Sequence, residues 1–161
     1  MTNSFSVMTY SPTDVKLVVA GYPVAGWETI SINRISQGFQ PIPGIRGKDT
    51  RSKNPKTSAI VTVTTVMTSQ TNDVLSYIHD RDLEYGTGRI VLTLKDNSGR
   101  SVFSSNEAFI QGFPEVVFSG NAEYRSWKLY CQTTETYNVG GNSRPVNSIF
   151  SSAVDFVSNI I

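Results

Sequence analysis

Apolar and polar residues alternate along much of the chain, and this period of two predicts a mainly β protein. The stretch DVKLVVAG places Val15, Leu17 and Val19 on one face. In SAIVTVTTVMT the odd positions from Ala59 to Met67 are largely apolar, and the even positions are largely threonine. The stretch WETISINRI is expected to set Glu28, Ile30 and Ile32 opposite Trp27, Thr29 and Ser31.

Four later segments complete the predicted sheet. RIVLTLKDNSGRSVF predicts a hairpin whose turn is residues 96–99. EAFIQGF and EVVFSG predict two further strands that meet at Pro114, and EYRSWKLYCQT predicts the last one.

The segment TNDVLSYIHDRDLEYG predicts a helix within this β region. Thr71 or Asn72 can cap its start, and Gly86 suits the position just after its end. Its shared apolar face consists of Val74, Leu75 and Ile78. The element order therefore indicates a small β-sandwich or barrel with one flanking helix over residues 1–135.

Residues 136–161 form a linker followed by a predicted C-terminal amphipathic helix that begins near Pro145. Its apolar stripe must be covered by the chain's own sheet or by a neighbouring subunit. A membrane surface is disfavoured because the polar face carries Ser and Asn rather than Lys and Arg. The expected docking face consists of Val146, Ile149, Phe150, Val154, Val157 and Ile160.

A long loop is expected from about Gln40 to Thr57, because its three prolines and two glycines do not suit a central strand. Within it, GIRGKDTRSKNPKT carries five cations and one acid, a local charge of +4. The whole chain is +1, so the remainder sums to −3. The charged residues are Arg46, Lys48, Asp49, Arg51, Lys53 and Lys56.

Composition narrows the functional classes. Only 17% of the residues are charged, and the near-neutral balance argues against a general polyanion binder. The single cysteine, Cys131, allows no internal disulfide and is expected to be a small buried hydrophobe. We expect neither a signal peptide nor a membrane span, and therefore synthesis in the cytoplasm.

Candidate chemistry is weak throughout the sequence. A phosphate-binding loop at RGKDT would need a glycine where Ile42 stands and a Ser or Thr in place of Asp49. His79 is the single histidine, is expected to be partly exposed, and has no cluster to complete a metal site. Glu107 and Glu115 lack the aromatic cleft expected of a glycosidase. We therefore expect no catalytic, metal or cofactor site.

Residues 10–135 resemble the tail tube proteins of contractile-tailed bacteriophages. The resemblance lies in YSPTDVKLVVAGYPVAGW, ISINR, SAIVTVTTVMTSQTNDVLSYIHDRDL and SNEAFIQGFPEVVFSGNAEYRSWKLYC. It implies a structural, non-enzymatic virion protein, similar in fold to type VI secretion tube subunits, that forms stacked hexameric rings. The implied partners are further copies of the chain, the sheath, and the tape-measure and baseplate or terminator proteins, with DNA passing through the lumen.

In that family a long loop between early strands reaches the adjacent ring, and residues 42–57 match its position. The resemblance therefore implies that the charged residues of this loop make contacts between rings. Two alternatives stay open: a tube subunit of a secretion or bacteriocin-like contractile particle, and a nucleic-acid-binding β-module that uses loop 44–57. The second lacks interleaved aromatics, since none lies between residues 40 and 76.

Overall fold

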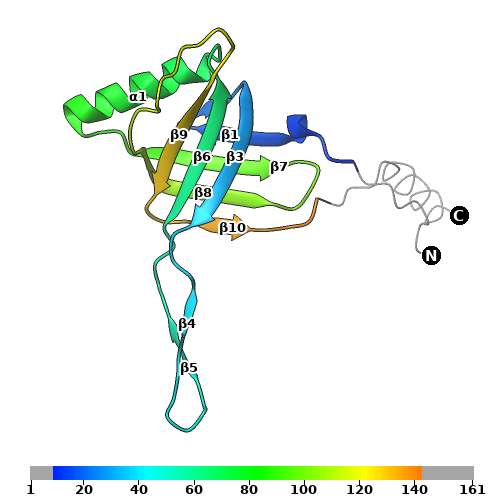
Figure 1. The fold of residues 1–161 in the computed structure, drawn as a ribbon, viewed down its shortest axis with the longest axis vertical. Helices are drawn as coiled ribbons and strands as arrows, with labels where there is room; N and C mark the ends of the chain where they lie inside the picture. The colour runs from blue at the N-terminus through cyan, green and yellow to red at the C-terminus, as the bar shows by residue number, and fades with distance from the viewer. Residues whose placement is uncertain (1–8, 143–161) are drawn as a thin grey trace, which may run out of the picture.

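The computed structural model describes residues 9–142, which form two crossing layers of strands and one flanking helix (Figure 1). This confirms the mainly β fold with one flanking helix. The elements are a short 3-10 helix Pro12–Asp14, β1 Val15–Val19, β2 Tyr22–Pro23, β3 Trp27–Arg34, β4 Phe39–Ile42, β5 Thr50–Lys53, β6 Ala59–Val66, α1 Thr71–Tyr85, β7 Ile90–Asp96, β8 Val102–Ile110, β9 Tyr124–Cys131 and β10 Thr136–Asn138.

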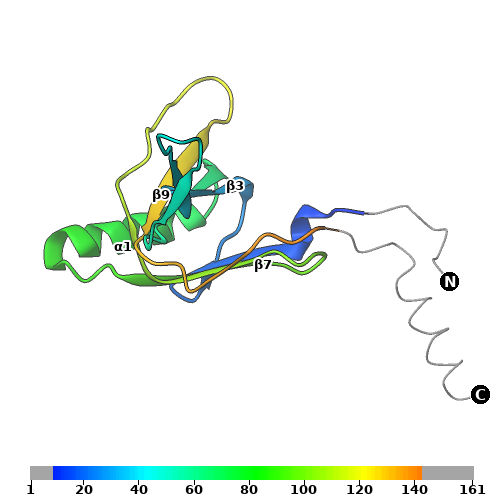
Figure 2. The ribbon, with the colours of Figure 1, turned by 90° about the horizontal axis from the view of Figure 1, so that it is seen from below.

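Both layers belong to one antiparallel sheet with the order β2-β1-β7-β8-β9-β6-β3. Strand β8 joins the layers, because it pairs with β10 through residues 102–104 and with β9 through residues 108–110. Viewed from below, β3 and β9 lie on the other side of the sandwich from β7 (Figure 2). This crossing arrangement corresponds to orthogonal sheet packing, in which a shared strand turns the corner.

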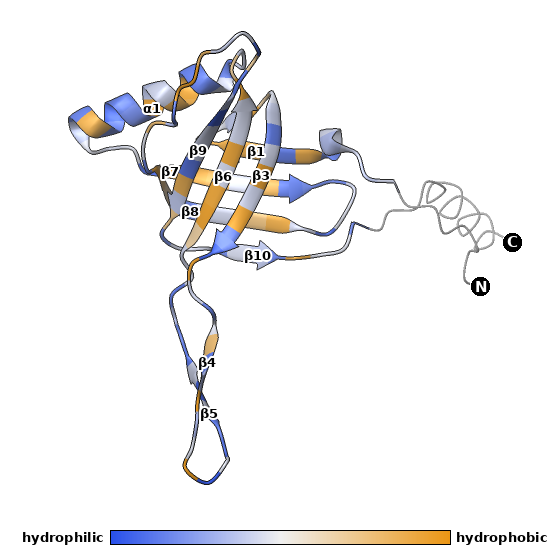
Figure 3. Ribbon diagram, viewed as in Figure 1, coloured by the Kyte–Doolittle hydropathy of each residue, from blue (hydrophilic) through white to orange (hydrophobic). Residues whose placement is uncertain are grey.

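The core lies between the layers and follows the alternation expected from the sequence. Ala59, Val61 and Val63 of β6 are fully buried, as are Leu17 and Val19 of β1 to within 1%. Figure 3 shows the pattern as apolar bands along β6. Burial of these alternate side chains supplies the main driving force for folding.

The expected face pattern of β3 is wrong at its start. Trp27 pairs with Thr65 and Thr29 pairs with Thr64, so β3 contains a bulge at Glu28. The extra residue moves Trp27 to the core side with Ile30 and leaves Glu28 exposed. The prediction that Ile30 and Ile32 share the inner face is confirmed.

The expected strand at residues 115–120 is absent, and residues 111–123 form an irregular segment. The Gln111 N–H bonds to the carbonyl of Lys128, after which Pro114 interrupts the run of N–H donors. The predicted strands ending at Phe103 and beginning at Glu107 are one continuous strand, β8. The turn at residues 96–99 is confirmed.

Helix α1 is confirmed, but neither Thr71 nor Asn72 is its N-cap residue. Its N-cap position is Gln70, which makes no side-chain cap bond, whereas Gly86 adopts φ +68° at the other end as expected. The buried face consists of Thr71, Leu75 and His79. His79 is only 6% exposed, so its expected partial exposure is wrong; its ring packs edge-on against Phe113 at 4.6 Å between centroids.

Candidate assembly surface

The expected long loop is largely a hairpin that projects from the end of the sandwich (Figure 1). Strands β4 and β5 pair in register, and every residue of both is exposed. The prolines of this segment predict a loop, but in a two-stranded ribbon half of the N–H groups face solvent. Pro41 is therefore tolerated opposite Arg51.

Two glycines shape the hairpin tip. The Gly47 N–H bonds to the Gly44 carbonyl at 3.2 Å, and Gly47 has φ +78°, a conformation that other residues rarely adopt. At Gly44 a Cβ atom would collide with the carbonyl oxygen of Lys48. Ile45 lies between them and is fully exposed, which places an apolar side chain at the extreme end of the projection.

The predicted contact residues lie at the hairpin tip, on β5 and just after β5, and all are exposed. The Arg51 guanidinium stacks over the Phe39 ring, with its carbon 4.2 Å from the centroid. Within residues 9–142 the ion pairs do not involve any of the hairpin cations. The six predicted contact residues are Arg46, Lys48, Asp49, Arg51, Lys53 and Lys56.

Strand β3 presents an open edge beside the hairpin. Among the described strands its hydrogen-bonding partner is β6 alone, so its other side carries unpaired backbone groups. Exposed apolar side chains gather on the irregular segment, at Phe113, Val116, Val117 and Phe118. An open eight-residue edge and an exposed apolar segment both favour association.

A groove of about 440 Å³ lies between β3 and the ends of the opposite layer. Its apolar lining comes from both layers, and its walls include Tyr10 and Asn142, which lie at the two ends of the described chain. Sequence reasoning did not find this groove, because its walls meet only once the layers cross. The apolar residues include Trp27, Ile30, Ile32, Val102, Phe103 and Tyr137.

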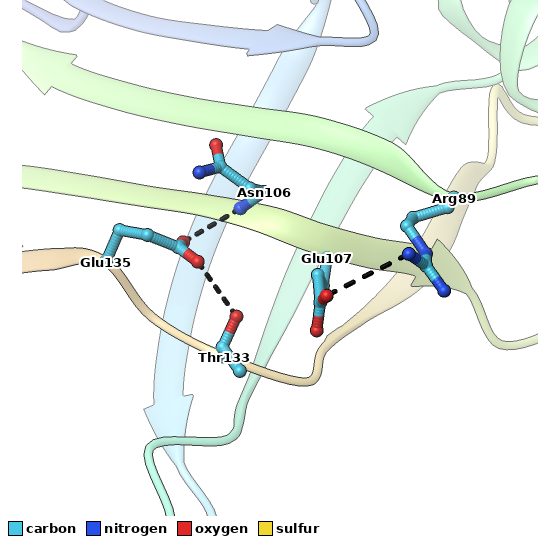
Figure 4. Close-up of polar contacts among 5 residues, drawn as sticks. All are labelled: Arg89, Asn106, Glu107, Thr133 and Glu135. Carbon is cyan, nitrogen blue, oxygen red and sulfur yellow. Dashed lines mark hydrogen bonds and ion pairs between the residues drawn. The ribbon is translucent and has the colours of Figure 1, made fainter.

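Of the two carboxylates singled out in the sequence, Glu107 has an ion-pair partner, since it lies 3.9 Å from the guanidinium of Arg89 (Figure 4). Glu115 is exposed on the irregular segment. Although desolvation raises the pKa of Glu135, hydrogen bonds from the Asn106 N–H and the Thr133 hydroxyl lower it below its usual value. Among residues 9–142 the acidic, histidine and cysteine side chains form no cluster suited to a metal.

Cys131 is fully buried, as expected. Burial raises the pKa of its thiol from 9.0 to about 11, against the lowering effect of Ser105. The thiol therefore stays protonated and inert at neutral pH. In the described part of the chain, α1 is too short and too polar to span a membrane.

The C-terminal docking face lies outside the described residues, so it stays a prediction. The sheet itself continues past residue 135, because β10 pairs with β8 through Thr136 and Asn138. Tyr137, between them, packs edge-on against Phe103 at 5.2 Å. Part of the expected linker is therefore a strand.

A curated relative supports the expected resemblance. The structural protein ORF10 of Pseudomonas phage KPP10 is 32% identical over 147 residues, and the match covers 84% of each chain. A comparison with descriptions of known protein families found none that matches.

Solved structures of contractile injection systems share the fold. A chain of the sheath–tube complex of the extracellular system PVC in its extended state has a TM-score of 0.58 at 13% identity, covering 86% of this chain and 99% of that one. A chain of the PVC sheath/tube terminator has a TM-score of 0.54 at 12% identity, and the match covers 80% of this chain and 96% of that one. A chain of the tube-terminating cap of the anti-feeding prophage has a TM-score of 0.52 at 8% identity, and the match covers 86% of this chain and 100% of that one.

At these low identities the similarity to the solved structures shows a shared fold only. The sequence match to ORF10 shows membership of the same family. The two findings agree with each other and with the resemblance to tail tube proteins. The chain belongs to the family of the phage structural protein ORF10 and has the fold of tube and terminator components of contractile injection systems.

Proposed function

We propose that this chain is the repeating subunit of a contractile tail's inner tube, which self-assembles into stacked hexameric rings through which DNA leaves the particle. The observation that carries this proposal is the β4–β5 hairpin. It extends away from the sandwich with all strand residues exposed, and it makes hydrogen bonds chiefly within itself. A two-stranded hairpin alone is marginally stable in water, so a partner surface would stabilise it.

The hairpin supplies the contact along the tube axis in this proposal. Residues 44–57, which include the hairpin tip and β5, carry a local charge of +4 while the rest of the chain sums to −3, so a basic arm of one ring can meet acidic residues of the next. Each exposed ion pair contributes only about 0–1 kcal/mol, and repetition around a ring gives the contact its strength. Such a head-to-tail contact repeats without closing, which is what a tube requires.

The open edge of β3 supplies the contact around the ring. Adding a neighbour's strand to this edge would satisfy the unpaired backbone groups of residues 27–34 and remove an aggregation-prone surface. The exposed apolar side chains from Phe113 to Phe118 offer further area for burial. Sheath, tape-measure and baseplate or terminator proteins are the further partners proposed for the assembled particle.

Electron microscopy of the purified full chain tests this function. We expect rings with six subunits that stack into tubes of one diameter as concentration rises. A chain that stays monomeric at high concentration after long incubation would contradict the proposal. Rings of another symmetry would contradict the hexamer while leaving tube formation standing.

A nucleic-acid-binding module using the same hairpin makes a different prediction. It requires the unassembled chain to bind DNA with an affinity that falls steeply with salt. The single aromatic side chain of the hairpin, Phe39, is stacked beneath Arg51, which leaves no aromatic platform for bases. Fluorescence anisotropy with labelled DNA, measured below the assembly concentration, separates the two functions.

A further inference from the structure

The groove between the layers is the open side of the sandwich. Strand β3 forms one wall of the groove. Strand β10 and the ends of β7 and β8 form the opposite wall. The Arg34 guanidinium lies 5.6 Å from the centre of the Tyr137 ring and connects the two walls. The views agree that β3 lies in the layer opposite β7 (Figures 1 and 2).

Core-facing side chains remain partly uncovered along this groove. Val15, Trp27, Ile30, Ile32 and Tyr137 pack against the buried core, yet none is itself buried. Covering apolar surface is worth about 25 cal/mol per Å². An apolar element laid into the groove would therefore complete the core.

The polar groups of the groove do not point to a small-molecule ligand. Asp96 accepts hydrogen bonds from Ser98 at 2.7 Å and from Asn142 at 3.0 Å. The Ser101 hydroxyl donates to the Gly140 carbonyl, and the Asn138 amide donates to a backbone carbonyl. These groups are occupied within the chain, so they do not converge on an unfilled position as they do in ligand sites.

We propose that residues 143–161 of the same chain occupy this groove with their apolar stripe inward. Asn142 is both a wall of the groove and the residue from which this segment continues. As a helix, the 17 residues from Pro145 onward would be about 25 Å long. The segment carries only two charges, at Arg144 and Asp155, which suits an apolar site.

Covalent attachment next to the groove favours residues 143–161 of the same chain over the same segment of another copy. A segment joined at the groove has an effective concentration in the millimolar range, so it outcompetes the same segment of another copy. Residues 1–8 precede Tyr10, which also lines the groove, and their apolar side chains are Met1, Phe5, Val7 and Met8. As a helix these eight residues would be only about 12 Å long, about half the length of the C-terminal segment, so they would cover less of the groove. The inference concerns the single chain and does not depend on tube formation.

Matched variants of the full chain test the occupant. Phe150→Asp with Val154→Asp places two charges in the apolar stripe, whereas Ser148→Asp with Ser152→Asp places two on the opposite face. We expect the first pair to red-shift tryptophan emission and increase acrylamide quenching, because Trp27 lines the groove and Trp127 is buried elsewhere. The second pair should behave as wild type, and equal behaviour of the two pairs would overturn the proposal.

Photo-crosslinking in an otherwise native chain keeps the proposal testable even if a charged variant unfolds. A benzophenone amino acid replaces Val102, which lines the groove. We expect an intramolecular crosslink to residues 143–161, identified by mass spectrometry at low protein concentration. A crosslink to residues 1–8, a crosslink to a second chain, or no crosslink would each overturn the proposal.

Discussion

The indole N–H of Trp127 on β9 donates a 2.9 Å hydrogen bond to the Asn72 side-chain oxygen in the first turn of α1. The Thr65 hydroxyl donates to the same oxygen at 2.8 Å. The Asn72 amide in turn donates to the carbonyls of Val66 and Ser69. The Asn72 side chain thus joins the start of the helix to two neighbouring strands. From its position in the sequence, only a helix-capping role is expected.

Replacing this side chain should destabilise the fold. In Asn72→Ala the buried Trp127 N–H loses its acceptor, and the Thr65 hydroxyl keeps only the Arg125 carbonyl at 3.5 Å. A buried group left unsatisfied costs about 1–3 kcal/mol. Urea unfolding at concentrations below assembly measures the loss. Gln70→Ala is the control, because Gln70 is exposed two residues away and makes no side-chain cap bond. Equal losses in the two variants would contradict this role for Asn72.

Removing hairpin charge should block axial stacking without unfolding the chain. The variant Arg46, Lys48, Arg51 and Lys53→Ser is expected to keep the wild-type circular dichroism spectrum and to form rings but few tubes, because the axial contact loses its cations. Electron microscopy and sedimentation measure the outcome. The control removes four exposed cations elsewhere, at Lys16, Arg89, Lys95 and Lys128.

Comparing the hairpin variant with the control variant separates the effect of where the charge is removed from the effect of net charge. If the hairpin variant polymerised like wild type, the proposed axial contact would be wrong. If both variants lost tubes equally, net charge rather than the hairpin would control assembly. High salt should weaken stacking of the wild type in the same direction, since exposed ion pairs are screened.

Assembly should be more sensitive to substitution of Gly44 at the hairpin tip than of Gly38 at its base. In Gly44→Ala the new methyl meets the Lys48 carbonyl, so the tip must change shape and assembly should fall. In Gly38→Ala, at the hairpin base, nothing lies within 4 Å of the new atom. Assembly rates followed by light scattering should separate the two, while urea midpoints stay close to wild type. Equal assembly of both variants would show that the tip shape does not matter.

Cys131 should be protected in the native chain. Thiol reagents at pH 8 should label it slowly until urea unfolds the protein, because the thiol is buried and protonated. Its raised pKa means that the folded state holds the proton more tightly. Stability from this group is therefore present below pH 9.0 and is lost as the pH rises towards about 11.

The variant Cys131→Ala isolates this contribution. The two proteins share every other ionisable side chain, so the difference between the two unfolding curves reports Cys131. We expect wild-type stability to fall more steeply than that of the variant above pH 9.0. Rapid labelling of the native thiol, or parallel pH profiles, would contradict the assigned environment.

Local pattern was sufficient to predict most strands and the helix. Val61 and Leu92 lie inward because residue alternation and strand pleat share a period of two. The bulge at Glu28 could not be predicted, since it depends on the register that β3 adopts against β6. Strand β10 has only three residues, too few for a period to emerge.

The site was predicted in part. The hairpin cations are recognisable in the sequence as a local concentration of charge. The pairing of Pro41 with Arg51 is not, because proline is excluded from a central strand but tolerated in a two-stranded ribbon. The groove was not recognisable at all. Trp27 and Tyr137 lie more than a hundred positions apart in the chain and come together only when the layers cross.

The hairpin connects β3 to β6, so the open edge, the projecting arm and a strand whose alternate residues are buried follow one another directly in the chain. Under the proposed function, a neighbour that adds to β3 would restrain the base of the arm that reaches the next ring. Growth around the ring and growth along the axis would then be cooperative. A completed ring would be a better template for the next one than any isolated subunit, which favours long tubes over scattered fragments.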